Sequence, residues 1–458
     1  MNWNIENLAS VVSGDLITLD KKSVDFTSIS TDTRTIEKGA LYIAIKGDNF
    51  DGHDFIKQAF EKGAVVALVS KKIETNCPLV IVEDTRIALG VFASWHRQQI
   101  DLKKLIAITG SNGKTTCKNM VQHLLSSLTN EGKVLATEGN FNNDFGVPRT
   151  LLNLRKQHEF AVIEMGANHP KEIDYVSQLA LPDVALITLA AGVHLEGFGS
   201  LNGVVETKSE IMNGLSSGGT VILNADSYGF DSWQALAVKK SLKVLTFGKS
   251  KKATFQLLAF KQHATSLAFS FSYNSIHYNV NLPLLGEHNA LNALASLAVC
   301  EAVGFDIEAL IPPLAIFSGV KGRLQAFKLP NGLLLDDTYN ASPSSMKAGI
   351  DALVSNASKS IFCMGDMGEI GKDSIKEHLS VANYAKEKGV SFLLCCGEET
   401  KDLPNIFGKG GFWFETKQAL AEKAIQLINS EQAESCLVKG SRFMKMEEIV
   451  NIIIKGTK

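Results

Sequence analysis

The sequence predicts an α/β protein of three domains, built on mostly parallel sheets. Three observations support this. The chain has 458 residues, more than one ordinary domain core holds. Short apolar runs typical of strands alternate with helical segments along most of its length. One such run, Leu105–Ile108, leads directly into a glycine-containing loop and a helix. We expect domain ranges of 1–100, 101–320 and 321–458.

The first region reads as a small α/β module. Short strand-like runs occur at Ala40–Ile45, Val65–Val69 and Leu79–Val82, separated by polar loops. A helix is expected from Thr85 to Gln99. This module would precede the central domain.

The loop between strand and helix in the central region is the most informative segment. Residues 109–116 read TGSNGKTT, directly after Leu105–Ile108. Apolar residues at helical spacing follow it: Met120, Val121, Leu124, Leu125 and Leu128. A glycine-containing loop at a helix N-terminus directs backbone N–H groups and the positive end of the helix dipole toward a phosphate. The segment therefore predicts binding of ATP or GTP.

Within this loop the side chains have separate expected tasks. Lys114 would reach the β- and γ-phosphates, and the Thr115 hydroxyl would bind Mg²⁺. The usual loop has four residues between its glycines, whereas two separate Gly110 and Gly113. A glycine-rich turn with an unrelated lysine is disfavoured, because strand, glycines, Lys-Thr-Thr and helix stand in register. The expected phosphate contacts are Gly110, Ser111, Asn112, Gly113, Lys114, Thr115 and Thr116.

The rest of the central region predicts a doubly wound, mostly parallel sheet with added antiparallel strands. Buried strands are expected at Phe160–Ile163, Val184–Leu189, Thr220–Leu223 and Val244–Phe247. Residues 253–282 alternate polar and apolar side chains around a turn at 273–275, which is typical of antiparallel hairpins. A helix over 289–303 would close the region.

The third region predicts a Rossmann-like domain, in which strands alternate with helices. Its expected strands are Leu333–Leu335, Ile361–Met364, Phe392–Cys395 and Ser435–Val438. The preceding segment 317–323 contains Gly319 and Gly322, whose backbone freedom suits a hinge.

Composition excludes several classes of function. Hydrophobic residues make up 45% and charged residues 21% of the chain, as in a soluble globular protein. A net charge of -2 without a long basic run argues against nucleic acid as the main partner. The seven cysteines show no C-x-x-C or zinc spacing, which favours reduced thiols in a cytoplasmic protein. We expect no signal peptide and no membrane span.

Several further residues are candidates for chemistry because they follow predicted strands. Glu164 directly follows Phe160–Ile163, at the sheet edge where ligands bind, and is a candidate Mg²⁺ ligand rather than a solvated carboxylate. Asp337 ends a strand of the third region, where an aspartate often binds ribose hydroxyls. His194 follows a third strand, although a lone histidine is more often structural than a ligand.

Two candidates lie on predicted helices. Lys208 would stand on a helix, where most lysines are solvated. Asn289 begins a helix, so its amide could either cap that helix or contact a base. Pro343 after Ser342 is typical of another helix N-terminus.

Taken together, these motifs resemble the Mur ligases, the ATP-dependent enzymes that build the peptide stem of bacterial peptidoglycan. Residues 30–64 resemble the family's uridine-nucleotide-binding module, with Asp32-Thr33-Arg34 where the family commonly has Asp-Ser-Arg. The run TEGNFNNDFGVPRTLL resembles the member that adds D-alanyl-D-alanine, rather than those that add diaminopimelate or lysine. The other matching segments follow in the expected order: IEMGANHPKEI, HLEGFGS, LGEHNALNAL, GRLQ, DDTYNASPSSM, GDMGEIG and VKGSR.

The resemblance implies a role for each matching residue. For the nucleotide, it implies that Lys114 binds phosphates, Asn289 contacts adenine, Arg323 the γ-phosphate and Asp337 the ribose. For metal, it implies that Thr115 and Glu164 bind one Mg²⁺ and that His194 helps to bind a second. Lys208 matches a lysine that carries a carbamate, although Thr207-Lys208-Ser209-Glu210 departs from the family's Ala-Lys-Gly-Glu. The implied contacts of the UDP-muramyl substrate are Thr33, Arg34, Thr137, Asn140 and Asn143.

The resemblance thus implies an ATP-dependent ligase for cell-wall synthesis. It would join D-alanyl-D-alanine to UDP-N-acetylmuramoyl-tripeptide through an acyl phosphate, giving the UDP-linked pentapeptide. One alternative is another amide ligase of the superfamily, such as a folylpolyglutamate synthase, which lacks the uridine module. A nucleotide-dependent switch or motor would explain only the phosphate loop. We expect a cytoplasmic monomer; the sequence leaves the third stem residue open.

Overall fold

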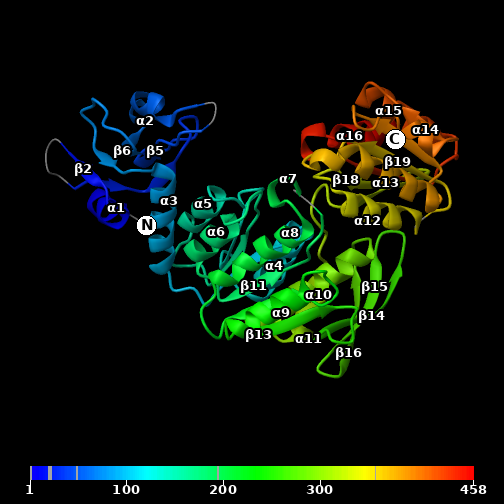
Figure 1. Ribbon diagram of the computed structural model, residues 1–458, viewed down its shortest axis with the longest axis horizontal. Coiled ribbons are helices and arrows are strands. Elements are labelled where there is room, and N and C mark those ends of the chain that lie inside the picture. Colours follow the sequence, from blue (N-terminus) through cyan, green and yellow to red (C-terminus); the bar gives the residue numbers. More distant parts are fainter. Residues whose placement is uncertain (1–2, 19–22, 48–49, 193–194, 356, 458) are drawn as a thin grey trace.

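The computed structural model describes residues 3–18, 23–47, 50–192, 195–355 and 357–457. Its three main sheets span residues 15–81, 104–282 and 325–439. Figure 1 shows the corresponding regions in chain order, with the N-terminal and C-terminal regions both on the same side of the central one. The predicted α/β class with mostly parallel sheets is confirmed.

Among its described residues, the N-terminal region holds a five-stranded sheet. Its strand order is β2 (Asp15–Ile17), β7 (Leu79–Ile81), β6 (Ala64–Val69), β5 (Ala40–Ile43) and β4 (Ser28–Ser30). The short strands β1 (Trp3–Asn4) and β3 (Asp25–Phe26) pair separately. Helices α1 (Ile5–Val12) and α2 (Ile56–Glu61) accompany them, and α3 (Thr85–Gln98) leads toward the central region. The Asp84 carboxylate caps α3 by accepting from the N–H groups of Arg86 and Ile87.

The central region holds a nine-stranded sheet within the described part of the chain. Its parallel strands, in spatial order, are β14 (Phe255–Gln262), β13 (Lys243–Gly248), β12 (Thr220–Asn224), β11 (Val184–Ile187), β8 (Lys104–Thr109), β10 (Phe160–Glu164) and β9 (Val134–Ala136). The antiparallel strands β15 (Leu267–Tyr273) and β16 (Ile276–Leu282) extend one edge. Asn274 and Ser275 make the predicted turn with φ of 49° and 64°, so the expected hairpin is confirmed.

Two hydrophobic cores lie on opposite faces of this sheet. Residues of β8 alternate between them: Ile106 and Ile108 face one core, Leu105 and Ala107 the other. The first face packs against α4 (Lys114–Leu128), α10 (Glu287–Ala302) and α11 (Ile307–Leu314). The second packs against α5 (Gly146–Leu152), α6 (Glu172–Ala180), α8 (Leu201–Ser209) and α9 (Phe230–Lys239). Every parallel strand therefore ends at a shared edge between two helical layers.

The C-terminal region holds a six-stranded sheet in its described residues. The order is β17 (Gln325–Leu329), β18 (Gly332–Asp337), β22 (Ser435–Lys439), β19 (Ser360–Gly365), β20 (Phe392–Cys396) and β21 (Gly411–Trp413). The helices are α12 (Pro343–Val354), α13 (Ser374–Glu387), α14 (Leu403–Phe407), α15 (Lys417–Asn429) and α16 (Glu447–Gly456). The edge strands β17 and β21 were not expected, because half-buried edge strands lack a continuous apolar run.

The linker after α11 and several polar side-chain contacts join the central and C-terminal regions. The linker after α11 contains Gly319 and Gly322, with φ of 83° and 71°. Farther along the interface, Gln262 on β14 donates from Nε2 to Ser355 Oγ at 2.8 Å. Its Oε1 accepts from the N–H of Gly286, just before α10, at 2.8 Å. Gln262 thus ties α12 of the C-terminal region to the start of α10.

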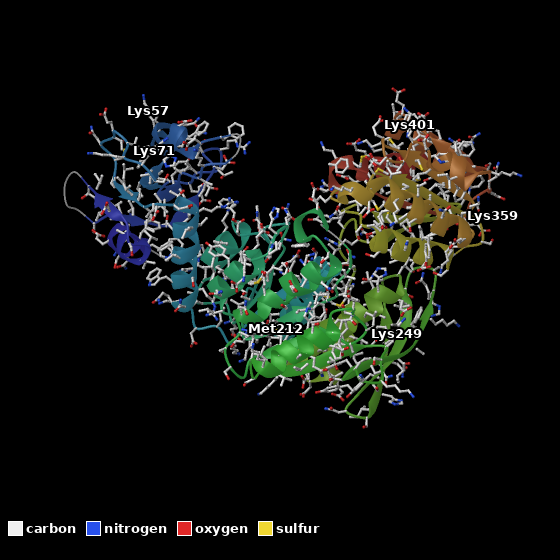
Figure 2. The ribbon with its side chains drawn as sticks, in the orientation of Figure 1. Lys57, Lys71, Met212, Lys249, Lys359 and Lys401 are labelled. Carbon is white, nitrogen blue, oxygen red and sulfur yellow. The ribbon has the colours of Figure 1, made fainter. Side chains whose placement is uncertain are left out.

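Exposed lysines lie on the outer surfaces of the N-terminal and C-terminal regions. Figure 2 shows Lys57 and Lys71 on the N-terminal region and Lys359 and Lys401 on the C-terminal region, all exposed. Lys249 Nζ lies 2.7 Å from the Oε1 of Glu287, the first residue of α10. Among the described residues, no helix combines the length and the apolar character that crossing a membrane requires.

Candidate active site

The phosphate loop forms as predicted between β8 and α4. Gly113 is the residue before α4 and has a φ of 85°, a left-handed conformation. A Cβ at Gly113 would lie 2.6 Å from Asn292 Oδ1, and one at Gly110 would collide with Thr188 Oγ1. Both glycines are therefore required by backbone conformation and close packing. Ser111 closes the loop by donating to Ala191 O at 3.0 Å.

Lys114 is folded back over this loop. Its Nζ donates to Gly110 O at 2.7 Å and to Ser111 O at 3.1 Å. Burial lowers the pKa of the Lys114 ammonium; the charge of Glu164 raises it, and that of Arg323 lowers it further. The cation is thus held at the N-terminus of α4, in a position to exchange backbone oxygens for phosphate oxygens.

The Glu164 carboxylate, at the end of β10, faces the start of α4. Thr115 Oγ1 donates to Glu164 Oε1 at 3.2 Å, and Asn142 Nδ2 donates to the same oxygen at 2.8 Å. The second oxygen, Oε2, is buried and has no hydrogen-bond partner among the described residues. A buried, unpaired carboxylate oxygen is costly unless a cation pairs with it. Together with the Thr115 hydroxyl, it fits the oxygen ligands that Mg²⁺ prefers.

Arg323 reaches this centre from the linker that precedes β17. Its Nη2 donates to Thr115 Oγ1 at 2.9 Å. The guanidinium lies 4.3 Å from the centre of the Tyr339 ring, a cation–π contact that holds its plane. Its Nε is buried without a hydrogen-bond partner in the described structure. Arg323 therefore brings a positive charge from the C-terminal side to the phosphate loop.

Asp337 lies across the site at the end of β18. Lys439 Nζ, at the end of the neighbouring strand β22, is 2.6 Å from Asp337 Oδ2, and the Lys439 side chain is 3% exposed. Asp337 Oδ1 accepts from the N–H of Leu324 at 3.1 Å. Lys439 was not singled out from the sequence, although its position at a strand end is the same signal that identified Asp337.

Asn289 is buried in the first turn of α10. Its Nδ2 donates to Leu285 O at 2.8 Å, and its Oδ1 accepts from Asn292 at 3.1 Å. Of the two expectations for this amide, the observed bonds are those of a local helix-start contact. Asn289 also lines the same cavity as the phosphate loop.

Lys208 is buried rather than solvated, with 2% of the residue exposed. It projects from α8, and its Nζ lies 5.1 Å from the centre of the Phe198 ring. Burial, helped by the charge of Lys114, lowers the pKa of Lys208 to about 7, against the opposing charges of Glu210 and Glu172. A lysine in this state is partly neutral near pH 7 and can act as a nucleophile.

One cavity of about 550 Å³ unites these groups. The predicted residues that line it are Gly110, Ser111, Asn112, Gly113, Lys114, Thr115, Thr116, Asn140, Asn143, Glu164, Lys208, Asn289, Arg323 and Asp337. Its wall also includes residues of the C-terminal region, so the cavity lies between two regions of the chain. Sequence reasoning did not single out Asn142, Tyr339 and Lys439, which also line it.

The remaining predicted residues lie elsewhere. His194 lies outside the described residues. Thr137 is buried behind Glu164, whose N–H donates to Thr137 Oγ1 at 2.9 Å. Thr33 and Arg34 belong to the N-terminal region: Thr33 donates to Gln58, and the Arg34 guanidinium lies 2.7 Å from Asp32. The structure does not bring Thr33 and Arg34 to the cavity.

Three domains of one protein family together match most of the chain. Residues 108–300 match the Mur ligase middle domain, and residues 322–442 the Mur ligase, glutamate ligase domain. Residues 25–96 match the Mur ligase family, catalytic domain. These three matches follow the order of the three sheets.

Two curated relatives match over nearly their full length. The UDP-N-acetylmuramoyl-tripeptide–D-alanyl-D-alanine ligase of Escherichia coli (strain K12) is 40% identical over 452 residues, covering 98% of each chain. The ligase of the same name from Bacillus subtilis (strain 168) is 32% identical over 465 residues, covering 99% of this chain and 98% of the relative.

Solved structures show the same arrangement. MurF from Acinetobacter baumannii superposes with a TM-score of 0.92 at 33% identity over 99% of both chains. MurF ligase from Thermotoga maritima, solved in complex with ADP, has a TM-score of 0.83 at 26% identity over 94% of this chain and 97% of that one. Folylpolyglutamate synthase from Mycobacterium tuberculosis, at 15% identity and a TM-score of 0.66 over 80% of this chain and 94% of that one, shares the fold.

Proposed function

The chain belongs to the Mur ligase family, and we infer that it joins D-alanyl-D-alanine to UDP-N-acetylmuramoyl-tripeptide at the expense of ATP. The main observation in support is that the chain is 40% identical, over 98% of both chains, to a UDP-N-acetylmuramoyl-tripeptide–D-alanyl-D-alanine ligase. The cavity agrees, because it joins a phosphate loop to a second set of strand ends. The product is a UDP-linked pentapeptide, a precursor for peptidoglycan and so for cell shape and division.

The first chemical step requires activation of a carboxylate. The terminal carboxylate of the tripeptide attacks the γ-phosphorus of ATP, which gives an acyl phosphate and ADP. Two unit negative charges 4 Å apart repel each other by about 4 kcal/mol at an effective dielectric constant of 20. We propose that Lys114 and Arg323 offset this repulsion by binding phosphate oxygens of the nucleotide.

We propose that Mg²⁺ binds between Thr115 and Glu164. The unpaired, buried Glu164 Oε2 supports a cation at this position. When bound, Mg²⁺ would further neutralise the phosphates. A carbamate on Lys208 would convert a buried ammonium into an oxygen ligand, and the lowered pKa of Lys208 supports its formation. His194 is proposed to help hold a second Mg²⁺.

In the second step the amine of D-alanyl-D-alanine attacks the acyl carbon. The amide bond forms as the C–O bond to phosphate breaks, and the amine releases a proton. We propose that Asn289 and Asp337 hold the adenine and ribose during both steps. Asp337 would contact ribose with Lys439 at its side, since that ion pair already fixes the carboxylate.

The UDP-muramyl substrate would bind farther toward the N-terminal region. We propose Thr33, Arg34, Thr137, Asn140 and Asn143 as its contacts, with domain boundaries near residues 100 and 320. The cytoplasm, which supplies ATP and nucleotide-linked sugars, is the proposed location, and a monomer the proposed state. The free state of all seven cysteines agrees with a reducing compartment.

The reaction itself gives a direct prediction. Sustained turnover to ADP and phosphate is expected only when the UDP-muramyl-tripeptide, D-alanyl-D-alanine and Mg²⁺ are all present, because the tripeptide carboxylate accepts the phosphoryl group and the amine of the dipeptide consumes the acyl phosphate. A coupled ADP assay with single omissions tests this. Equal turnover with lysine in place of the dipeptide would contradict the assignment within the family. Turnover with a folate and glutamate instead would favour the folylpolyglutamate synthase alternative.

Closure of the C-terminal region is a second prediction. We expect an ATP analogue together with the UDP-muramyl-tripeptide to lower the radius of gyration. Rotation about Gly319 and Gly322 would draw the C-terminal strand ends onto the nucleotide and exclude water from the acyl phosphate. Small-angle scattering with each ligand alone and with both measures the change. A radius of gyration unchanged at saturating ligand concentrations would count against this closure.

A further inference from the structure

Asn142 links two segments that the proposed function gives different tasks. It belongs to the loop 137–143, whose neighbours Asn140 and Asn143 are the proposed contacts of the UDP-muramyl substrate. Its side chain nevertheless points to Glu164, the proposed metal ligand: Asn142 Nδ2 donates to Glu164 Oε1 at 2.8 Å. A backbone hydrogen bond links the same two segments: the N–H of Gly166 donates to Asn142 O at 2.8 Å.

The loop is fastened to the end of β10 at both ends. Thr137, at its start, accepts from the N–H of Glu164 at 2.9 Å. Near its other end, the Asn142 amide lies flat against Gly166: a Cβ at Gly166 would lie 3.0 Å from Asn142 Oδ1 and 3.1 Å from both Cγ and Nδ2. The absence of a side chain at Gly166 therefore leaves the space that the Asn142 amide occupies. A displacement of the loop would also move the amide that donates to Glu164.

The hydrogen bonds distinguish the two carboxylate oxygens of Glu164. Oε1 accepts from both Asn142 and Thr115, whereas Oε2 is buried and has no such partner in the described part of the chain. Two donors on one oxygen resist rotation of the carboxylate, so Oε2 is left free to bind a cation. Groups of this kind orient metal ligands and are commonly worth about 10- to 100-fold in metal affinity.

We propose that Asn142 is a positioning residue that holds Glu164 Oε2 toward the metal and transmits binding of the UDP-muramyl substrate to the metal–nucleotide site. The proposal rests on the proposed function, from which the tasks of Asn140, Asn143 and Glu164 are taken. Binding of the substrate to Asn140 and Asn143 fixes the position of the loop 137–143. Because the Asn142 amide donates to Glu164, the orientation of the Glu164 carboxylate is fixed as well. By linkage, the metal–nucleotide complex must tighten substrate binding by the same factor.

Isothermal titration of the full-length protein with the non-hydrolysable analogue AMP-PNP tests the first half of this proposal. Asn142→Ala is expected to weaken binding of Mg·AMP-PNP by about tenfold. Binding of AMP-PNP in EDTA should change by less than about twofold, since Asn142 acts through a metal ligand. Asn153→Ala, at an exposed asparagine after α5, is the matched control and should behave as the wild type. An equal loss with and without Mg²⁺ would overturn the positioning role.

The same titrations with saturating UDP-muramyl-tripeptide test the second half. In the wild type the substrate should tighten Mg·AMP-PNP binding several-fold, and in Asn142→Ala this ratio should fall to about one. The substrate is kept at ten or more times its dissociation constant for each variant, so weak binding cannot mimic lost coupling. A wild-type ratio retained in Asn142→Ala would overturn the transmission. A wild-type protein that binds no UDP-muramyl-tripeptide would contradict the proposed function itself, while the Mg²⁺ comparison would still decide the positioning role.

A second variant guards against a folding defect. Gly166→Ala leaves Asn142 in place but puts a methyl group 3.0–3.1 Å from its amide, so the amide must move by a few tenths of an ångström, which strains its hydrogen bond to Glu164. It should reproduce the selective loss of Mg·AMP-PNP affinity. Circular dichroism and thermal unfolding of both variants should match the wild type. A folded Gly166→Ala protein with unaltered Mg²⁺ dependence would contradict the proposal.

Discussion

Replacing Lys114 with methionine is expected to lower kcat for ADP formation by about a thousandfold, the scale on which a lost charge at a transferred phosphoryl group is felt. Methionine is unbranched and similar in length, so it fills the same space without the charge. The Lys114 ammonium lies within 2.7–3.1 Å of two loop carbonyls, at the point where phosphate would enter. Because the charge acts on the transition state, kcat should fall more than the KM for ATP rises.

Steady-state kinetics with both substrates saturating measures this effect. Lys359→Met, at an exposed lysine on the far side of the C-terminal region, is the matched control and should retain wild-type kinetics. Unfolding of the Lys114 variant is excluded if its thermal midpoint is not lowered. A folded Lys114→Met enzyme that keeps more than about a tenth of the wild-type kcat would contradict the role of Lys114 at the γ-phosphate.

Lys208→Ala is expected to reduce kcat by roughly two to three orders of magnitude, since it removes the proposed carbamate from the metal site. The structure gives the chemical reason for modification at this residue. A carbamate forms when a neutral amine attacks CO₂, with one proton released. Burial beside Lys114 lowers the pKa of Lys208 to about 7, so about half of the amine is neutral at that pH.

The pH dependence of carbamylation follows from the lowered pKa of Lys208. At a fixed concentration of dissolved CO₂, the carbamylated fraction should rise as the pH rises through 7. Below pH 6 the neutral amine becomes about tenfold scarcer with each unit. An ordinary lysine, with a pKa near 10.4, would carbamylate little across this range.

Carbon-13 NMR of the protein in ¹³C-labelled bicarbonate provides the measurement. A protein-bound carbamate signal should appear in the wild type, disappear in Lys208→Ala and weaken reversibly on acidification. Short carboxylic acids such as acetate should restore part of the activity of Lys208→Ala, because they supply the missing oxygen ligand. Full activity in CO₂-free buffer, with an unmodified Lys208 in the nucleotide- and metal-bound enzyme, would contradict the carbamate.

Local patterns in the chain were sufficient for most elements of the fold. The predicted strand Phe160–Ile163 lies within β10 (Phe160–Glu164), and the expected hairpin turn is the observed turn at Asn274 and Ser275. Both follow from interactions between residues close in sequence: apolar runs fill a buried sheet, and short polar residues adopt the left-handed turn. The edge strands β17 and β21 escaped prediction because their pairing depends on strands far along the chain.

The phosphate loop could also be predicted from the sequence, because its chemistry depends on eight consecutive residues and the helix that follows them. The burial of Lys208, by contrast, could not be predicted from its own helix, because a lysine on a helix is ordinarily solvated. Lys208 is buried because α8 packs against other segments of the chain. The same holds for Arg323 against Thr115, separated by 208 residues, and for Lys439 against Asp337, separated by 102. A pattern in sequence specifies which face of an element is apolar, whereas a contact between distant polar groups exists only once the sheets are packed. For that reason the sequence was enough to predict a nucleotide-binding α/β protein, and the folded chain was needed to show that Asn142 holds Glu164.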